Sequence, residues 1–347
     1  MKASLANLLM LIFFTAIGLG LAELALRFFH PQHTFYPKPF VTDDFGMELP
    51  RNAKIVDRQG RQWEFIYHTN ELGRRGPYVP IAESYARPNV VVLGDSYTFG
   101  NGVRDDEVYT QVMARHLRDR LTVINGGVGG WGIDSEIKWF FQTGRLYDPK
   151  YVVLQFAGND PVDSFTGVTQ VKDGRFIFNP FTGSRPFWQK ILSESWLLQN
   201  SHLYALARDA YGRHRRRTLE SERTAARGEG NVDLPQSIYV KMLRLFAEEL
   251  HSQGVLLLFV SVTQKKEETS EYQYQIDDFP YIKEEVERLK SRALLVFIEL
   301  PLAQMEKYSI SPEGHQWSDD HHEIVATAIS RHLLKLEGLN TEAQMTR

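Results

Sequence analysis

Four short polar segments follow apolar runs in this sequence, and their residue types suit attack on an acyl group. They are GDS at 94–96, NGGVGGWG at 125–132, AGND at 157–160 and SPEGHQWSDDHH at 311–322. A serine on a sharp turn after a strand can act as a nucleophile when a histidine takes its proton. The negative charge that forms on the carbonyl oxygen then needs preorganised hydrogen-bond donors. Together the four segments contain a serine hydroxyl that can attack, histidines that can take its proton, and N–H groups that can donate hydrogen bonds to the oxyanion.

The predicted nucleophile is Ser96, which follows the apolar run 90–93 at a turn. We expect the backbone N–H groups of Ser96 and Gly130 and the side-chain amide of Asn159 to donate to the oxyanion. Each segment alone has a simpler explanation, because GDS and AGND are also common turn and helix-cap sequences. Their ordered occurrence after successive apolar runs favours a catalytic site.

These segments need a scaffold, and the second part of the chain alternates apolar runs with helical patterns. The predicted strands are 90–93, 121–125, 151–156, 255–262 and 293–300. The predicted helices are about 108–120, 134–143, 187–212, 235–253, 281–289 and 318–336. This alternation predicts a parallel sheet covered by helices on both faces. In such sheets functional groups gather at the carboxyl ends of the strands, where the polar segments lie.

The glycine-rich segment also matches the dinucleotide-binding pattern G-x-G-x-x-G through Gly127, Gly129 and Gly132. It follows the second predicted strand rather than the first, and no acidic residue ends a strand about 20 positions later. We therefore predict no nucleotide cofactor. The net charge of −3 gives no reason to expect a nucleic-acid partner. The chain has no cysteine and none of the strong metal-ligand spacings, so we expect no metal.

The order of GDS, a glycine-rich turn with Gly130, the Asn of AGND and a late histidine resembles the SGNH (GDSL-type) hydrolases. The resemblance covers residues 89–162 and about 293–335. It implies an α/β fold, a flavodoxin-like three-layer αβα sandwich with a five-stranded parallel sheet. It also implies that Ser96 is the nucleophile and that Gly130 and Asn159 are oxyanion donors.

A second resemblance concerns TNELGRRGP at 69–77, which precedes LGDSYTFGNGV at 93–103. This combination is similar to the membrane-anchored bacterial branch of the family, which is often associated with cell-surface polysaccharides. The resemblance implies a carbohydrate ester as the substrate.

Two registers in the last polar segment, each a pair of an acidic residue and a histidine, are candidates for the catalytic base and its partner. One pairs Glu313 with His315, with Glu in place of the family's usual Asp, and the other pairs Asp319 with His322. Ser318 is a predicted N-cap, which would place His322 inside the final helix and favours the first register. If Glu313 does not reach His315, the site is a Ser-His dyad whose ring is oriented by a backbone carbonyl.

The N-terminal residues 1–30 are predicted to be a transmembrane anchor. The apolar run 8–22 follows Lys2 and extends to about the 20 residues that a spanning helix needs. A cleaved signal peptide and a soluble helix are the alternatives, and LAELA is a poor cleavage site. We expect a single-pass bacterial inner-membrane protein whose body is periplasmic.

Beyond the anchor we expect an N-terminal extension at 31–88 that packs on a catalytic domain at 89–340. The extension includes a hairpin at 54–57 and 63–68, and the catalytic domain includes a helical insertion at about 163–235. Within the insertion, the basic run RHRRR at 213–217 is expected to be solvated, with contact to a membrane surface as the alternative.

The expected function is a serine esterase that removes a small acyl group, an O-acetyl group in our interpretation, from a glycan. One alternative is an O-acetyltransferase with the same triad, in which a sugar hydroxyl replaces water. Another is a non-catalytic glycan-binding or assembly protein with the same fold. Trp131, Trp139 and Trp317 are expected in the core rather than against a sugar. No sequence feature indicates an oligomeric state.

Overall fold

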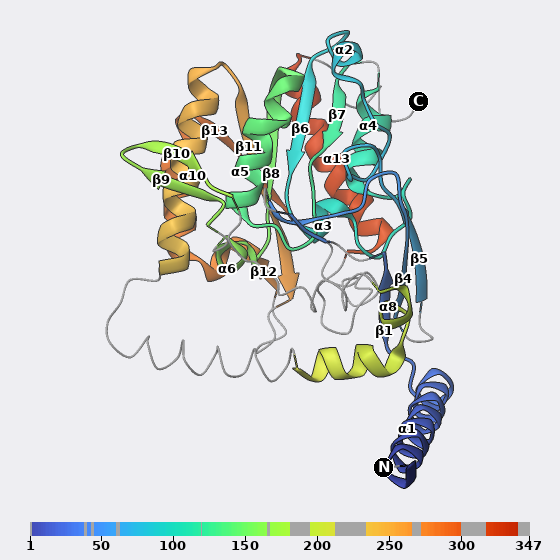
Figure 1. Cartoon of the computed structure of the whole chain (residues 1–347). Coiled ribbons are helices and arrows are strands. Elements are labelled where there is room, and N and C mark those ends of the chain that lie inside the picture. The colour runs from blue at the N-terminus through green and yellow to red at the C-terminus, as the bar shows by residue number, and fades with distance from the viewer. Residues whose placement is uncertain are drawn as a thin grey trace. The chain divides into compact units, whose positions relative to one another are not determined.

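Figure 1 shows the computed structural model of the chain. It describes residues 2–37, 40–42, 45–59, 63–118, 120–164, 167–180, 195–211, 234–265, 272–299 and 317–338. The chain divides into two compact units, which are described separately below. The first unit contains residues 1–38, 54–67 and 185–231, and the second contains 39–53, 68–184 and 232–347.

A parallel sheet forms the centre of the second unit. Its strands are β6 (Asn89–Leu93), β7 (Thr122–Asn125), β8 (Pro149–Phe156), β11 (Leu256–Lys265) and β13 (Ala293–Ile298). They pair in the order β7-β6-β8-β11-β13, and every pair is parallel. This is the flavodoxin-like order 2-1-3-4-5. The predicted five-stranded parallel sheet is therefore confirmed, and β12 (Tyr272–Tyr274) adds an antiparallel strand beside the end of β11.

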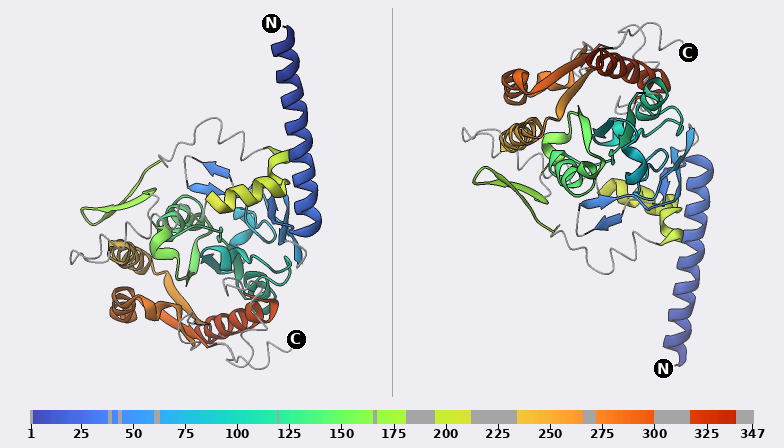
Figure 2. Two further views of the ribbon diagram at one scale, coloured as in Figure 1. Left: turned by 90° about the horizontal axis from the view of Figure 1, so that it is seen from below. Right: turned by 90° about the horizontal axis from the view of Figure 1, so that it is seen from above.

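Helices cover both faces of this sheet, as Figures 1 and 2 show. One face packs on α4 (Tyr109–Leu117) and α13 (Asp319–Leu336), whose side chains share a core with Val90 and Val92 of β6. The other face packs on α5 (Ile133–Gln142) and α10 (Leu234–Ser252), and α11 (Pro280–Arg288) contacts α10. All five residues of β6 are buried, because a strand covered on both faces has no solvated side. This is the predicted three-layer αβα sandwich.

Shorter elements complete the second unit. The strands are β2 (Phe40–Thr42) paired with β3 (Gly46–Glu48), and β9 (Thr169–Lys172) paired with β10 (Arg175–Phe178). The short helices are α2 (Ile81–Ser84), α3 (Ser96–Phe99), α6 (Asp160–Asp163), η1 (Gly144–Tyr147), η2 (Gln275–Asp278) and η3 (Leu289–Ser291).

The last helix begins as the sequence predicts. The Oγ of Ser318 accepts the backbone N–H of His321 at 3.3 Å, so Ser318 is the N-cap of α13. Gly338 follows the helix in the left-handed conformation that commonly ends one. The helix therefore contains both Asp319 and His322.

The first unit contains α1 (Lys2–Phe29) and a three-stranded sheet. That sheet has the order β1 (His33–Tyr36), β4 (Lys54–Gln59), β5 (Trp63–His68), and it includes the predicted strand pair. The stretch Leu5–Phe29 of α1 is long enough and, with a mean hydropathy of 2.2, apolar enough to cross a membrane. A membrane anchor and a signal sequence both have this character.

The predicted continuous helix at 187–212 is interrupted within its described part. The described residues form α8 (Trp196–Gln199) and a separate helix at 202–211. The break occurs because Ser201 starts a new helix, with its Oγ accepting the backbone N–H of Tyr204 at 3.1 Å. The predicted domain boundaries at 30, 88 and 163–235 stay predictions.

Candidate active site

Ser96 lies at the turn that follows β6, as the first residue of α3. The carboxylate of Asp95 accepts the backbone N–H of Tyr97 at 3.0 Å and so caps this short helix. The Oγ of Ser96 donates to Oδ2 of Asp95 over 3.3 Å. Ser96 is only 8% exposed and Asp95 is fully buried. The turn therefore holds the serine hydroxyl at the carboxyl edge of the sheet, beside a buried carboxylate.

The glycine-rich segment after β7 lies directly against Ser96. Its backbone is tied to the neighbouring strand end, because the N–H of Val128 donates to the carbonyl of Gly94 at 3.2 Å. A Cβ added to Gly129 would lie 3.6 Å from the Cβ of Ser96. Gly130 has a φ of +81°, a conformation that strongly favours glycine. The predicted donor Gly130 is the next residue after Gly129, and a Cβ added to Gly130 would meet the side chain of Met47 at 2.9 Å.

Asn159 reaches the same place from the end of β8. Its Nδ2 donates to Oδ2 of Asp95 at 3.0 Å and to Oδ2 of Asp163 at 2.8 Å. Ser96, the Gly129–Gly130 turn and Asn159 thus follow three adjacent strands, and Asp95 is a shared hydrogen-bond partner of Ser96 and Asn159. Sequence reasoning gave no role to Asp95 or Asp163. The spacing of four residues between Asn159 and Asp163 would have placed them on one face of a helix.

The two histidine registers differ in what the structure describes. Glu313 and His315 lie outside the described residues. Asp319 is exposed in the first turn of α13, whereas His322 is fully buried. The Nδ1 of His322 accepts the backbone N–H of Tyr109 at 3.2 Å.

Burial of His322 controls its protonation. Burial, helped by the positive charge of Arg75, lowers its pKa to about 3, so the ring is neutral near pH 7. In a neutral ring whose Nδ1 accepts a hydrogen bond, Nε2 carries the proton. This tautomer leaves no free lone pair with which His322 could accept the serine proton.

The three tryptophans expected in the core are buried there. Trp131, Trp139 and Trp317 are at most 4% exposed. The Trp317 ring packs 4.7 Å from that of Tyr97, the residue that follows Ser96, and the Trp131 Nε1–H donates to the carbonyl of Met47 at 2.5 Å. The expectation that packing is their role is confirmed.

A comparison with protein families identifies this part of the chain. Residues 92–255 match the model of the GDSL-like Lipase/Acylhydrolase family. The chain carries a GDSL-like lipase/acylhydrolase domain. Lipases and acylhydrolases cleave esters, so this is the domain of an ester hydrolase. A search of curated protein sequences found no match.

Solved structures with a similar fold share little sequence with this chain. A putative lipolytic protein of the G-D-S-L family from Desulfitobacterium hafniense DCB-2 is 10% identical, with a TM-score of 0.39, over 71% of this chain and 99% of that one. The acetylxylan esterase Axe2 from Geobacillus stearothermophilus is 12% identical, with a TM-score of 0.41, over 73% and 95%. A two-domain esterase active on acetylated mannans is also 12% identical, with a TM-score of 0.41, over 76% of this chain and 53% of that one.

Buried acids lie close to Asp95, the residue before the predicted nucleophile Ser96. Both carboxylate oxygens of Glu136 on α5 are buried and have no hydrogen-bond partner among the described residues. Burial raises the pKa of Glu136 well above its ordinary value, and the charges of Asp95 and Asp134 raise it further. Burial and the neighbouring Glu136 likewise raise the pKa of Asp160. The cluster therefore favours protonated carboxyl groups behind the Asp95 carboxylate.

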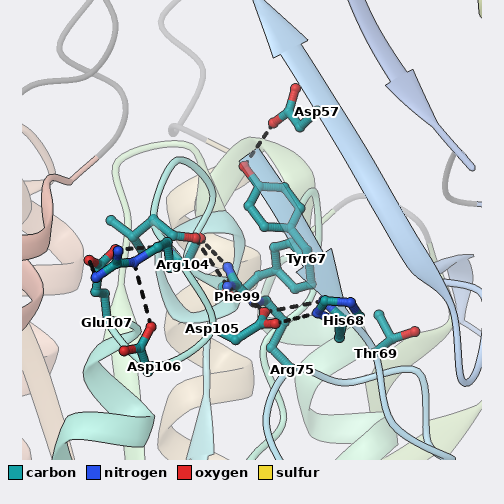
Figure 3. A network of polar contacts seen from close by, with 12 residues as sticks. Asp57, Tyr67, His68, Thr69, Arg75, Phe99, Arg104, Asp105, Asp106 and Glu107 are labelled. Carbon is teal, nitrogen blue, oxygen red and sulfur yellow. Dashed lines mark hydrogen bonds and ion pairs between the residues drawn. The ribbon is translucent and has the colours of Figure 1, made fainter. Parts of the chain in front are cut away.

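Arg75, from the segment TNELGRRGP, clamps the loop that follows α3 (Figure 3). Its fully buried guanidinium donates to the carbonyls of Gly100 and of Val103, the latter at 3.1 Å. It also pairs with Oδ1 of Asp105 at 2.7 Å, while Oδ2 of Asp105 lies 2.7 Å from Nδ1 of His68. The C-terminal end of the helix that begins at Ser96 is thereby attached to a buried cation.

No cation site accompanies these groups in the described part of the chain. No group of three or more His, Cys, Asp or Glu side chains there is arranged to hold a metal ion.

Proposed function

We propose that this chain is a membrane-anchored serine esterase that removes a small acyl group, an O-acetyl group, from a glycan outside the cytoplasm. The observation that carries the esterase part is the meeting of Ser96, the Gly129–Gly130 turn and Asn159 at adjacent strand ends. This arrangement supports a site in which a hydroxyl and two kinds of N–H donor act on one acyl group, as acyl transfer requires.

The chemistry proceeds through an acyl-enzyme. As His315 takes its proton, the Ser96 Oγ attacks the ester carbonyl carbon, and the carbonyl oxygen becomes an oxyanion. The backbone N–H groups of Ser96 and Gly130 donate to that oxygen, and Asn159 joins them by exchanging one of its two hydrogen bonds, to Asp95 or Asp163, for one to the oxyanion. The tetrahedral intermediate collapses, the C–O bond to the sugar breaks, and His315 returns the proton to the departing sugar oxygen. A water molecule then attacks the carbonyl carbon of the acyl-enzyme while His315 takes its proton. The bond to the Ser96 Oγ breaks, His315 returns the proton to Ser96, and the carboxylic acid is released.

We assign the base to His315 rather than to His322. The hydrogen bond from Tyr109 occupies Nδ1 of His322, and its Nε2 carries the proton, so this ring has no lone pair for the nucleophile. We assign to the Glu313 carboxylate the role of orienting the His315 ring. If the carboxylate does not reach the ring, His315 acts in a dyad with Ser96.

Other features support the proposed glycan substrate and the proposed membrane anchor. The similarity of residues 69–77 and 93–103 to the membrane-anchored bacterial branch supports a cell-surface polysaccharide as the substrate. The length and hydropathy of α1 support a single span of the inner membrane. The lysine before the span supports an orientation with the catalytic body in the periplasm.

Hydrolysis of an aryl acetate by the wild-type chain and by Ser96→Ala tests the proposal. We expect Ser96→Ala to lower kcat/KM by about 10⁴-fold or more, because the Ser96 hydroxyl is the group that forms the acyl-enzyme. Ser291→Ala, at an exposed position far along the chain, is the matched control. Equal rates for wild type and Ser96→Ala would contradict the proposal.

A second assay separates hydrolysis from transfer. The chain is incubated with the aryl acetate and an oligosaccharide, and the products are analysed by mass spectrometry. Free acetate supports the esterase. Acetyl groups on the sugar would instead show the O-acetyltransferase, with the same acyl-enzyme and a different acceptor.

A further inference from the structure

The C-terminal part of α1 is hydrogen-bonded to a segment far along the chain, within the first unit. The Oε2 of Glu23 accepts the hydroxyl of Ser201 at 2.8 Å and the backbone N–H of Leu203 at 2.9 Å. Its Oε1 accepts the backbone N–H of His202 at 3.0 Å. Arg27, one helical turn later, pairs with Glu23 at 2.7 Å and donates to the carbonyl of Asn200. Glu23 therefore caps the N-terminus of the helix at 202–211.

These bonds relate the capped helix to the depth of α1 in a bilayer. Residues 5–22 of α1 rise about 27 Å at 1.5 Å per residue, which matches a hydrocarbon core of about 30 Å. Glu23 is the first charged residue after that stretch, so it lies at the level of the lipid headgroups. A segment whose backbone binds Glu23 must begin at the same level.

The segment at this level, residues 195–211, exposes large amphipathic and apolar side chains. Trp196 is 63% exposed, Leu197 is 70% exposed and Tyr211 is 66% exposed. Phe29 at the end of α1 is 89% exposed. Tryptophan and tyrosine are enriched at membrane–water interfaces, where an apolar ring and a polar atom are both accommodated.

The excess positive charge lies in the sequence that follows this segment. Arg27 and Arg208 are each paired with a carboxylate, Glu23 and Asp209, whereas the sequence RHRRR at 213–217, which begins two positions after Tyr211, has no acidic residue. Basic residues beside a membrane helix attract acidic headgroups, at about 1 kcal/mol for each Lys or Arg near the surface.

We propose that residues 195–211 form an interfacial surface that binds the headgroup region of the bilayer crossed by α1, with a preference for anionic lipid. This inference rests on the proposed anchor. The occupant is lipid rather than a protein partner, because the cap on Glu23 holds the surface at headgroup depth. The bonds of Glu23 also require an uncleaved α1, since cleavage after Ala25 would remove their acceptor.

The absence of cysteine allows a direct test with a single fluorescent label. Leu197→Cys in the full chain is labelled with an environment-sensitive probe, and Tyr281→Cys on α11, which is 52% exposed, is the matched control. Both proteins are reconstituted in vesicles of phosphatidylcholine, alone or mixed with phosphatidylglycerol. Lipids with a nitroxide on the headgroup are the quencher.

We expect the label at 197 to lose about half of its emission to the headgroup quencher, and the label at 281 to lose almost none. Phosphatidylglycerol should increase the quenching at 197. Equal quenching at the two positions would overturn the inference. Protection of the label at 197 that depends on protein concentration instead of lipid would show a protein contact, and would also overturn it.

Two further measurements separate this inference from the anchor itself. Retention of the chain in vesicles after an alkaline wash tests the anchor, and loss of the chain would contradict the anchor. Retention without quenching at 197 would contradict the interfacial surface alone. Glu23→Ala should reduce the quenching at 197 while the chain stays membrane-bound, because only the cap is lost. Unchanged quenching in Glu23→Ala would show that the cap does not hold the surface.

Discussion

The side-chain amide of Asn159 donates to the buried carboxylate of Asp95, with 3.0 Å between Nδ2 and Oδ2. The same oxygen accepts the hydroxyl of Ser96 at 3.3 Å. The Asp of the GDS sequence thus holds the predicted nucleophile and the predicted oxyanion donor in one hydrogen-bonded unit. Asp163, on the other side of the amide, fixes its second hydrogen-bond direction.

Replacement of Asn159 by alanine should reduce kcat far more than it changes KM. Loss of one oxyanion donor costs about 10²–10³-fold in kcat, because the charge develops only in the transition state. Asp163→Asn should cost less, since Asp95 still accepts from the amide. Kinetics with an aryl acetate measure both effects. An Asn159→Ala enzyme with wild-type kcat would remove Asn159 from the site.

The two candidates for the catalytic base, His315 and His322, predict opposite effects of their substitution on kcat/KM. His315→Ala should lower kcat/KM by about 10³-fold or more if it is the base. His322→Asn should stay within about ten-fold of wild type, because the Asn oxygen can still accept the N–H of Tyr109. Steady-state kinetics on folded protein measure both. The reverse pattern would move the base to His322.

His322 should also make the protein less stable in acid. Its pKa is about 3 when folded, compared with 6.5 for the free side chain. As the pH falls below 6.5 the unfolded chain binds a proton that the folded chain does not, so stability declines progressively toward pH 3. The slope is at most about 1.4 kcal/mol per pH unit. Urea unfolding at pH 7 and pH 5 should show a smaller loss in His322→Asn than in wild type.

Glu136 should have the opposite dependence on pH. Its folded pKa is raised above 4.5, so the folded chain keeps a proton that the unfolded chain has lost once the pH exceeds 4.5. Stability from this group therefore falls as the pH rises. Glu136→Gln removes the free-energy cost of keeping this carboxyl protonated in the folded chain. At pH 8 we therefore expect a higher Tm, by about 2–4 °C for each 1 kcal/mol gained in the free energy of unfolding. Thermal unfolding at pH 5 and pH 8 checks this, and a gain larger at pH 5 would contradict it.

We expect Arg75 to be a positioning residue that acts on Ser96 through α3, because it bonds the carbonyl of Gly100 at the end of that helix. Arg75→Lys keeps the charge but cannot reproduce the planar set of donors to two carbonyls and Asp105. We expect a loss of about 2–3 kcal/mol in stability and a lower kcat in the protein that remains folded. Arg104→Lys is the control, because that side chain is 71% exposed and lies in the same loop. Equal effects of the two substitutions would show that Arg75 does not position the turn.

The sequence by itself determined the elements whose signals are local. The five strands of the sheet and the position of Ser96 after the first of them follow from apolar runs that end in turn residues. Ser318 was identifiable as a cap because its position before Asp319 and Asp320 is a local pattern. The roles of Glu313 and His315 stay predictions from resemblance and from this cap.

Only the tertiary structure decided how distant residues share a site. Asp95, Asn159 and the Gly129–Gly130 turn meet because β6, β7 and β8 are adjacent in the sheet, and strand pairing is not a local property. Burial of His322 depends on the packing of α13 against α4, which sets its tautomer and lowers its pKa. The bonds from Glu23 to residues 201–203 likewise join positions about 180 residues apart. Such contacts depend on which surfaces pack together in the folded chain, and neither residue of a pair signals its partner in advance.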